Sequence, residues 1–306
     1  MKTVLILDVE NGSAGSALVQ LAPDKQPKLF GEVRSHAPLG SRVTGALLSS
    51  TIKKAASDAI RHAGEVAARI RLHPKAAPLG TVGSVAVFLA PPWGKPNLGQ
   101  GAPDFMPEMQ QYLRGELDAV FDDVPVSFYT SAGATAFGVH SLFAPEPCLV
   151  CTITGEVSEL MRMDGQGVRA HATFPSGLHA LLRTLRTHGG LSEAEARSAA
   201  RLPFDSKHIR EPFAAVALEF AGHFKNTVKE LLSPGDLLRV RVVGAEPAGE
   251  WFARALAANE SLAELFPDGG EVRALRSHHL TEHLGAHAEV PDLLLMLDAL
   301  FVDSGV

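Results

Sequence analysis

Val-Leu-Ile-Leu-Asp-Val-Glu-Asn-Gly-Ser-Ala-Gly, residues 4–15, is the stretch that decides the fold. Val4–Val9 has the composition of a buried strand, and Asn11-Gly12 is a strong signal for a tight hairpin turn. Ala14–Leu21 alternates well enough for a second strand, and Leu29–Ser35 predicts a third. The chain is therefore expected to open with a three-strand meander.

The same order of elements returns in the second half of the chain. Cys148–Thr154 predicts a buried strand, Gly155 a turn, and Val157–Met163 a second strand. Asp164-Gly165 predicts another hairpin turn, Val168–Phe174 a third strand, and helical patterns follow. Two copies of one strand–hairpin–strand–strand–helix unit indicate a duplicated α/β protein with a cleft between two lobes.

Several of these segments resemble the nucleotide-binding motifs of the actin, sugar kinase and heat-shock ATPase superfamily, and above all its bacterial FtsA and PilM branch. Leu7–Gly15 is similar to the first phosphate loop, an apolar strand ending in Asp-Ile-Gly-(small)-Gly-Ser. Cys151–Glu159 is similar to the second loop, usually Asp-Ile-Gly-Gly-Glu-x-Thr-Asp. Phe174–Gly177 is similar to the branch's Pro-x-Gly-Gly segment, and Val242–Ala245 to its adenosine-contacting Gly-Gly turn.

The resemblance implies an α/β fold of the actin-like (ribonuclease H-like) duplicated type, with two lobes around a cleft. The lobes are expected at residues 1–145 and 146–306. FtsA and PilM relatives carry an extra subdomain after the strand that corresponds to Ser84–Leu89. Residues 91–130 are expected to be a shortened version of that insertion.

In this superfamily, glycine amides approach the phosphates, and one Asp from each loop holds Mg²⁺ through water. The resemblance therefore implies Asp8 as the metal-binding residue and ATP with Mg²⁺ as the cofactor. If ATP does not bind, no other cofactor is expected. The candidate nucleotide-binding residues are Asp8, Asn11, Gly12, Ser13, Gly15, Thr152, Thr154, Gly155, Ser158 and Gly244.

Several positions depart from the family pattern. Glu10 stands where a glycine is expected, and its carboxylate would repel a triphosphate. Thr152 replaces the second Asp, Thr154 replaces a glycine, and Ser198 replaces an expected Lys. Phosphoryl transfer depends on positioning and on charge neutralisation, so efficient ATP hydrolysis is not expected. Nucleotide binding without turnover stays open.

Three hypotheses follow. The first is a scaffold protein in cell division or in pilus or envelope assembly with weak or no ATP binding, as FtsA and PilM imply. The second is an active Mg-ATP-dependent ATPase or small-molecule kinase of the same superfamily. The third is an unrelated metal-binding α/β protein, because His279, His283 and His287 are spaced four residues apart. Gly285 weakens a helix there, so a solvated or loop cluster is the simpler interpretation of His278–His287.

Two other patterns have structural interpretations. Asp8 can cap a turn at the end of its strand without binding a metal. Cys148 and Cys151 match a CxxC string, but residues three apart on a strand point to opposite faces. Two buried strand cysteines are therefore expected, rather than a redox or metal pair.

Composition limits the partners and the location. The formal net charge is −6, and the basic residues are scattered, which disfavours nucleic acid as a partner. No apolar run in the sequence is long enough to span a bilayer or to form a signal peptide. The expectation is a cytoplasmic protein, with any membrane contact peripheral at the inner membrane. Its partners are expected to be other proteins, envelope-associated assembly proteins among them, and self-association is one form that assembly can take.

Overall fold

The computed structural model describes residues 2–40, 45–73, 75–98, 102–143, 146–200, 210–232, 239–259, 270–286 and 291–305. These residues form two compact units. Unit 1 consists of Met1–Pro38, Val43–Leu142 and Ser277–Val306, and unit 2 consists of Leu39–Arg42 and Phe143–Arg276. Each unit is built around its own sheet.

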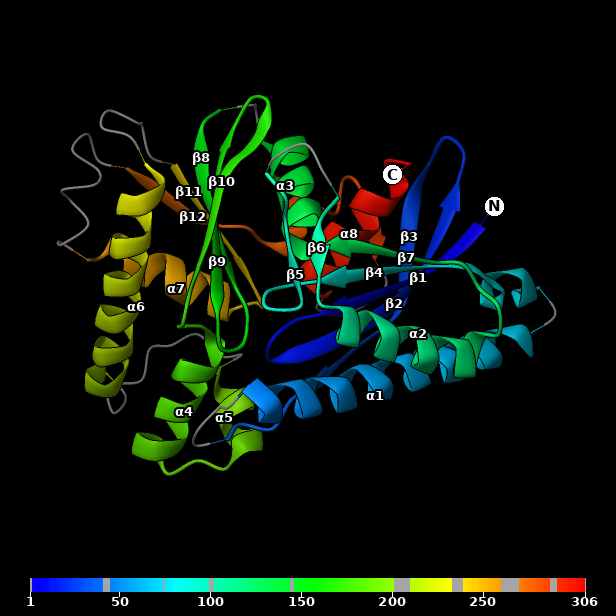
Figure 1. Cartoon of the computed structure of the whole chain (residues 1–306), viewed down its shortest axis with the longest axis horizontal. Helices are drawn as coiled ribbons and strands as arrows, with labels where there is room; N and C mark the ends of the chain where they lie inside the picture. The colour runs from blue at the N-terminus through cyan, green and yellow to red at the C-terminus, as the bar shows by residue number, and fades with distance from the viewer. Residues whose placement is uncertain are drawn as a thin grey trace. The chain divides into compact units, whose positions relative to one another are not determined.

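Unit 1 has a six-stranded sheet in the order β13-β3-β2-β1-β4-β7. Strands β1, β2 and β3 are antiparallel neighbours, whereas β4 and β7 run parallel to β1. Figure 1 shows α1 and α2 on one face of this sheet and α3 and α8 on the other. The elements are β1 (Lys2–Val9), β2 (Ser13–Ala22), β3 (Lys25–His36), α1 (Gly45–Arg71), η1 (Ala77–Gly80), β4 (Val82–Leu89), β5 (Gly94–Lys95), β6 (Asp104–Phe105), α2 (Pro107–Phe121), β7 (Val126–Thr130), α3 (Ser131–Leu142), η4 (Ser277–His279), β13 (Gly285–Ala286) and α8 (Leu293–Asp303).

Strand β1 has an apolar face that packs in the core, and acidic residues lie at its C-terminal end. Leu5, Leu7 and Val9 lie in the core against α1, whose small and branched residues form the facing stripe. Side chains alternate across a strand, so Asp8 and Glu10 point to the opposite face. Both are nevertheless buried, which places two carboxyl groups inside the protein at the end of the first strand.

Unit 2 repeats the same topology with the order β10-β9-β8-β11-β12. Strands β8, β9 and β10 are antiparallel, and β11 and β12 run parallel to β8, as β4 and β7 do to β1. The elements are β8 (Cys148–Ile153), β9 (Ser158–Asp164), β10 (Gly167–Phe174), α4 (Leu178–Gly189), α5 (Glu193–Ala199), α6 (Arg210–Leu231), β11 (Arg239–Gly244), α7 (Ala248–Ala257) and β12 (Glu271–Ala274). The predicted duplicated α/β fold is confirmed.

The bounds of the two units differ from the lobes expected at residues 1–145 and 146–306. The C-terminal segment Ser277–Val306 groups with unit 1. Its helix α8 places Phe301 against the rings of Phe88, Tyr129 and Phe137 at centroid distances of 5.7, 5.3 and 5.8 Å. These aromatic contacts anchor α8 to the sheet of unit 1.

The described residues between 91 and 130 include the short strands β5 and β6, helix α2 and the whole of strand β7. Met109, Leu113 and Leu117 of α2 belong to the core of unit 1. The region expected to be a shortened insertion therefore supplies a helix on which the core depends.

The histidine face that the metal-binding hypothesis requires is absent from the described part of the segment, as the simpler interpretation of a loop cluster predicts. His278 and His279 lie in the short 3₁₀ helix η4, and His283 lies in a turn, so these three do not share one α-helical face. His287 lies outside the described residues. The described residues contain no group of three or more His, Cys, Asp or Glu side chains that could hold a metal ion. None of the described helices is both long and apolar enough to cross a bilayer.

Candidate functional site

The candidate site of unit 1 is built on one row of residues across three strands. Asp8 on β1 pairs with Gly15 on β2, and Gly15 pairs with Arg34 on β3. Residues directly opposite each other in a sheet share a face. Because Gly15 has no side chain, the guanidinium of Arg34 reaches across β2 to Asp8.

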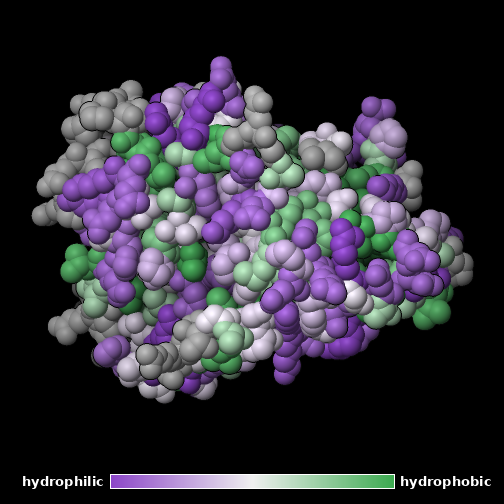
Figure 2. Space-filling view, viewed as in Figure 1, coloured by the Kyte–Doolittle hydropathy of each residue, from purple (hydrophilic) through white to green (hydrophobic). Residues whose placement is uncertain are grey.

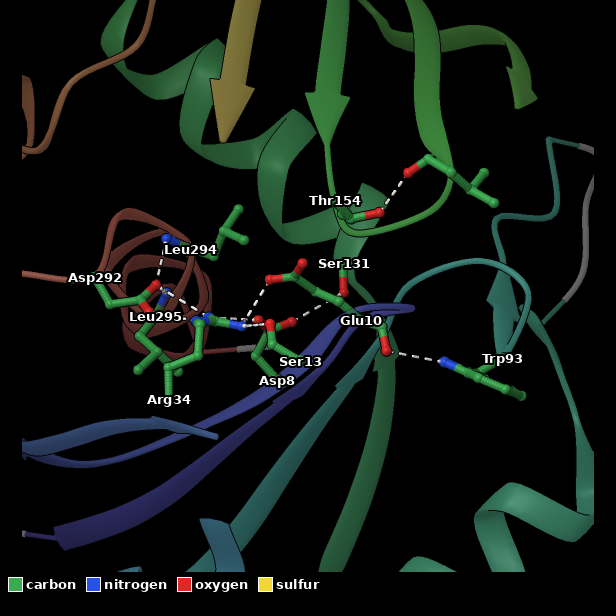
Figure 3. Close-up of polar contacts among 11 residues, drawn as sticks. Asp8, Glu10, Ser13, Arg34, Trp93, Ser131, Thr154, Asp292, Leu294 and Leu295 are labelled. Carbon is green, nitrogen blue, oxygen red and sulfur yellow. Dashed lines mark hydrogen bonds and ion pairs between the residues drawn. The ribbon is translucent and has the colours of Figure 1, made fainter. Parts of the chain in front are cut away.

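Arg34 uses all five of its N–H groups within the protein. Nε donates to Asp292 Oδ2 at 2.5 Å, and Nη2 donates to Asp292 Oδ1 at 3.0 Å and to Asp8 Oδ2 at 2.7 Å. Nη1 donates to Glu10 Oε1 at 2.6 Å and to Ser13 Oγ at 3.0 Å. Figure 3 shows the guanidinium between these groups. A guanidinium has five donors, so none is left for a phosphate.

Gly15 is required by this arrangement. A Cβ atom at residue 15 would lie 2.8 Å from Nη2 and 3.0 Å from Cζ of Arg34. The close approach that the resemblance assigns to a phosphate is made here by an arginine side chain.

Asp292 joins the C-terminal helix to the same cluster. It is the N-cap of α8, and its Oδ1 accepts hydrogen bonds from the amides of Leu294 and Leu295 at 3.1 and 3.2 Å. The same carboxylate holds Arg34 through both oxygens. One side chain thus caps α8 and attaches its first turn to β3.

The cluster holds more acid than its one guanidinium can neutralise. Burial raises the pKa of Asp8, and it raises the pKa of Glu10 to about 8, although Arg34 opposes both shifts. Burial also raises the pKa of Asp298 on α8 well above its usual range. Burial disfavours ionisation of Asp292 too, but Arg34 and the α8 amides outweigh it and lower the pKa of Asp292. Of these acids, Asp292 is therefore the one that ionises most readily.

The turn after β1 is also held by its own neighbours. The side-chain amide of Asn11 donates to the carbonyl of Pro91 at 2.9 Å, and Ala37 N–H donates to the carbonyl of Gly12 at 2.9 Å. The indole N–H of Trp93 donates to the carbonyl of Glu10 at 3.1 Å. These contacts fix the turn against the chain that follows β4 and β3.

The second turn, in unit 2, is packed against the start of α4. The carbonyls of Thr154 and Gly155 accept the backbone N–H groups of Leu178 and His179, each at 2.8 Å. A Cβ on Gly177 would lie 2.5 Å from the Thr154 carbonyl oxygen. The amides at this helix start are thus directed at the turn itself.

Glu156 in this turn is held by two side chains of α4, Arg183 and His179. Arg183 donates to its two oxygens at 2.8 and 2.9 Å, and Nδ1 of His179 lies 2.9 Å from Oε1. Burial would raise the pKa of Glu156, but these hydrogen bonds outweigh it and lower the pKa to about 2. Each unit therefore has a turn whose acid is bound by an arginine of the same unit.

Comparison with known proteins defines the fold. A scan against protein-family models and a search of curated proteins each find no match. Among solved structures, the PilM-PilN type IV pilus biogenesis complex matches with a TM-score of 0.60 and 14% identity, covering 98% of each chain. The ethanolamine utilization protein EutJ from Carboxydothermus hydrogenoformans gives 0.57 and 14%, covering 99% of this chain and 90% of that one. MreB 5 of Spiroplasma citri bound to AMPPNP gives 0.54 and 9%, covering 100% and 99%.

The chain has the actin-like fold.

Within this actin-like fold, the first group of candidate residues lies in unit 1. Asp8, Ser13 and Gly15 meet around Arg34, while Asn11 and Gly12 are bonded to neighbouring backbone. Asp8 is ion-paired with an internal arginine and so does not fit the role of an Mg²⁺ ligand. The guanidinium of Arg34 occupies the position beside its carboxylate that a metal ion would need.

The second group lies in unit 2. Ser158 Oγ donates to the Ser176 carbonyl at 2.6 Å, and Thr154 Oγ1 donates to the Val157 carbonyl at 2.5 Å. Thr152 Oγ1 is buried without a hydrogen-bond partner among the described residues. Gly244 lets the backbone of β11 approach Ile153, since a Cβ there would lie 3.1 Å from the Ile153 side chain.

No role was predicted from the sequence for Arg34, Asp292, Asp298, His179 or Arg183. A signal for Arg34 was present, because the Asn11-Gly12 hairpin sets Gly15 opposite Asp8. The next strand then places a lone cation within reach. The partner Asp292 lies more than 250 residues away in the chain, and no local pattern points to it.

We predict that Gly15→Ala lowers the free energy of unfolding by about 1–3 kcal/mol, because the added methyl displaces the guanidinium of Arg34. The backbone at Gly15 is ordinary strand, so strain at φ does not contribute. Urea unfolding measures the change. The control is Gly115→Ala at an exposed position of α2, where nothing lies within 4 Å of the new Cβ and the substitution should be neutral or stabilising. Equal stability of wild type and Gly15→Ala would refute the packing argument.

Glu10 should make the stability depend on pH. Its pKa is about 8 in the folded protein and near the ordinary 4.5 when unfolded, so the folded state keeps a proton that the unfolded state releases. The free energy of unfolding then falls as pH rises from about 4.5 to about 8, by up to about 1.4 kcal/mol per pH unit. Glu10→Gln should gain stability over wild type across this range.

The matched control is Glu65→Gln, which removes an exposed carboxylate paired with exposed Arg61. Its stability difference from wild type should stay nearly constant with pH. A Glu10→Gln difference as flat as that of the control would contradict the assignment of a protonated Glu10.

Proposed function

We propose that this chain is an actin-like scaffold protein that binds other proteins, with weak or no binding of ATP. The observation that carries the proposal is the set of five hydrogen bonds made by Arg34. In a nucleotide-dependent relative, a metal ion and phosphates would neutralise and fill the region beside the first turn. Here a permanent cation of the chain itself does both.

Two further residues support this proposal. Glu10 places a second carboxyl group beside Asp8, where a triphosphate would meet like charge whenever it ionises. Thr152 cannot supply the negative charge of a second metal-binding acid. Phosphoryl transfer depends on metal ions and positioned charges, so both residues weigh against an enzyme.

The setting proposed for this scaffold is the cytoplasm, in cell division or in pilus or envelope assembly, with any membrane contact peripheral. The similarity to PilM, whose structure was solved as a PilM-PilN complex, supports protein partners. Self-association is a second form that the scaffold function can take. The net charge of −6 supports proteins rather than nucleic acid as partners.

The alternative is an active Mg-ATP-dependent ATPase or small-molecule kinase. The structural match to MreB 5 bound to AMPPNP and the presence of Asp8 favour it. For this alternative, Arg34 would have to leave Asp8 when nucleotide enters, and Asp8 would have to exchange an internal ion pair for Mg²⁺.

A thermal shift assay separates the two. We predict no measurable change in the melting temperature of the wild-type protein with millimolar Mg-ATP, and no phosphate release. A specific ligand at about 100 times its Kd would add about 2.7 kcal/mol of stability. A clear shift would refute nucleotide-independent action. Turnover abolished by Asp8→Asn, but kept by Asp58→Asn on the exposed face of α1, would establish the ATPase instead.

A further inference from the structure

Strand β7 (Val126–Thr130) is an outer strand of the unit 1 sheet. It pairs with β4 on one side, and the carbonyl of Pro125 accepts the N–H of Val85. In a parallel ladder, alternate residues bond to the same neighbour. The backbone groups of Val126 and Phe128 therefore point away from β4, and no backbone group among the described residues pairs with them.

This edge lacks the protection that the equivalent edge in unit 2 carries. Strand β7 reads Val-Ser-Phe-Tyr-Thr, with no charged residue. The corresponding strand β12 reads Glu-Val-Arg-Ala, and Glu271 there forms ion pairs with Arg239, Arg241 and Arg273. Charges on an edge strand prevent pairing with other chains, so an uncharged edge is open to such pairing.

The side chains beside the edge offer an apolar surface and one cation. Phe128 is half-buried, with the ring of Phe105 at a centroid distance of 6.2 Å. The guanidinium carbon of exposed Arg114 lies 4.8 Å from the Phe128 ring centroid, and Arg114 has no ion pair among the described residues. Met106, next to Phe105, is 37% exposed. Figure 2 shows hydrophobic surface among polar residues on this face of unit 1.

We propose that β7 is a docking strand that pairs with an extended segment of another protein, with apolar side chains toward Phe128 and a carboxylate toward Arg114. Backbone pairing at a sheet edge supplies affinity in such contacts, and alternate side chains supply specificity. The unpaired guanidinium gives the charge complementarity that selects an acidic residue in the segment. A second copy of this chain is the weaker occupant, because a five-residue edge buries far less than the ~1,200 Å² of a stable interface.

This inference extends the proposed scaffold function by naming the partner's chemistry, but the two can fail separately. A nucleotide-induced shift in melting temperature would refute nucleotide-independent action and leave the docking strand standing. Peptide binding that is unchanged by substitutions in β7 would refute the docking strand and leave the Arg34 argument untouched.

The test uses a phage-displayed library of random dodecapeptides, selected on the full-length protein. The selected peptides should alternate apolar residues and carry at least one Asp or Glu. Their affinity should fall about fivefold or more for Val126→Pro, which removes one outward N–H group. Proline is tolerated at the first residue of an edge strand, so the fold should survive. Val126→Thr keeps the N–H group and should bind like wild type.

Arg114→Glu provides a second variant that leaves the backbone of β7 unchanged. A new selection on it should lose the preference for acidic residues and gain one for Lys or Arg. Peptides that bind wild type, Val126→Pro and Arg114→Glu equally would overturn the proposal. Sedimentation showing a wild-type dimer that Val126→Pro dissociates would overturn it in favour of a second copy.

Discussion

A single guanidinium holds the polar centre of unit 1 together. Arg34 lies among Asp8, Glu10 and Asp292, and each of its five N–H groups meets an oxygen of the same unit. Buried acids without a cation would be costly, and one cation cannot neutralise all of them. Burial raises the pKa values of Asp8, Glu10 and Asp298, and the single guanidinium of Arg34 does not offset it. Gly15 leaves room for this side chain, the hairpin register places Asp8 within its reach, and the N-cap of α8, Asp292, accepts its hydrogen bonds.

The same constraint connects the ends of the chain. The first hairpin and helix α8 meet at Asp292, which caps the helix and forms an ion pair with Arg34. In this chain the organising charge is covalently part of the protein, which is the physical basis for proposing action without nucleotide. The proposed scaffold would then act through protein contacts, such as the one proposed at β7.

The fold was largely predictable from local patterns. Asn11-Gly12 and the two apolar strands that begin near Val4 and Cys148 revealed the meander and its repetition, because turn chemistry and period-two burial act over few residues. The strand position of Cys148 and Cys151 was predicted for the same reason, but of the two only Cys151 is buried, and Cys148 is half-buried. The grouping of Ser277–Val306 with unit 1 was not foreseen, since its aromatic anchors lie far away in the chain.

The candidate site was less predictable. Asp8 and Gly15 were recognised from their spacing, but that spacing fits a phosphate loop and an arginine-filled turn equally well. What distinguishes them is Arg34 together with Asp292, a pair separated by 258 positions. Similarly, the role of Glu156 depends on Arg183 and His179, which α4 places beside it. Pairings across long sequence distances come from tertiary structure, and no motif encodes them locally.

The most direct test is a ¹H–¹⁵N spectrum of the arginine side chains. If every N–H group of Arg34 is hydrogen-bonded inside the protein, its Nη protons should give four separate signals that exchange slowly with water and disappear in Arg34→Lys. A single averaged Nη signal in rapid exchange with water would mean that the guanidinium is free, and the account of this site would be wrong.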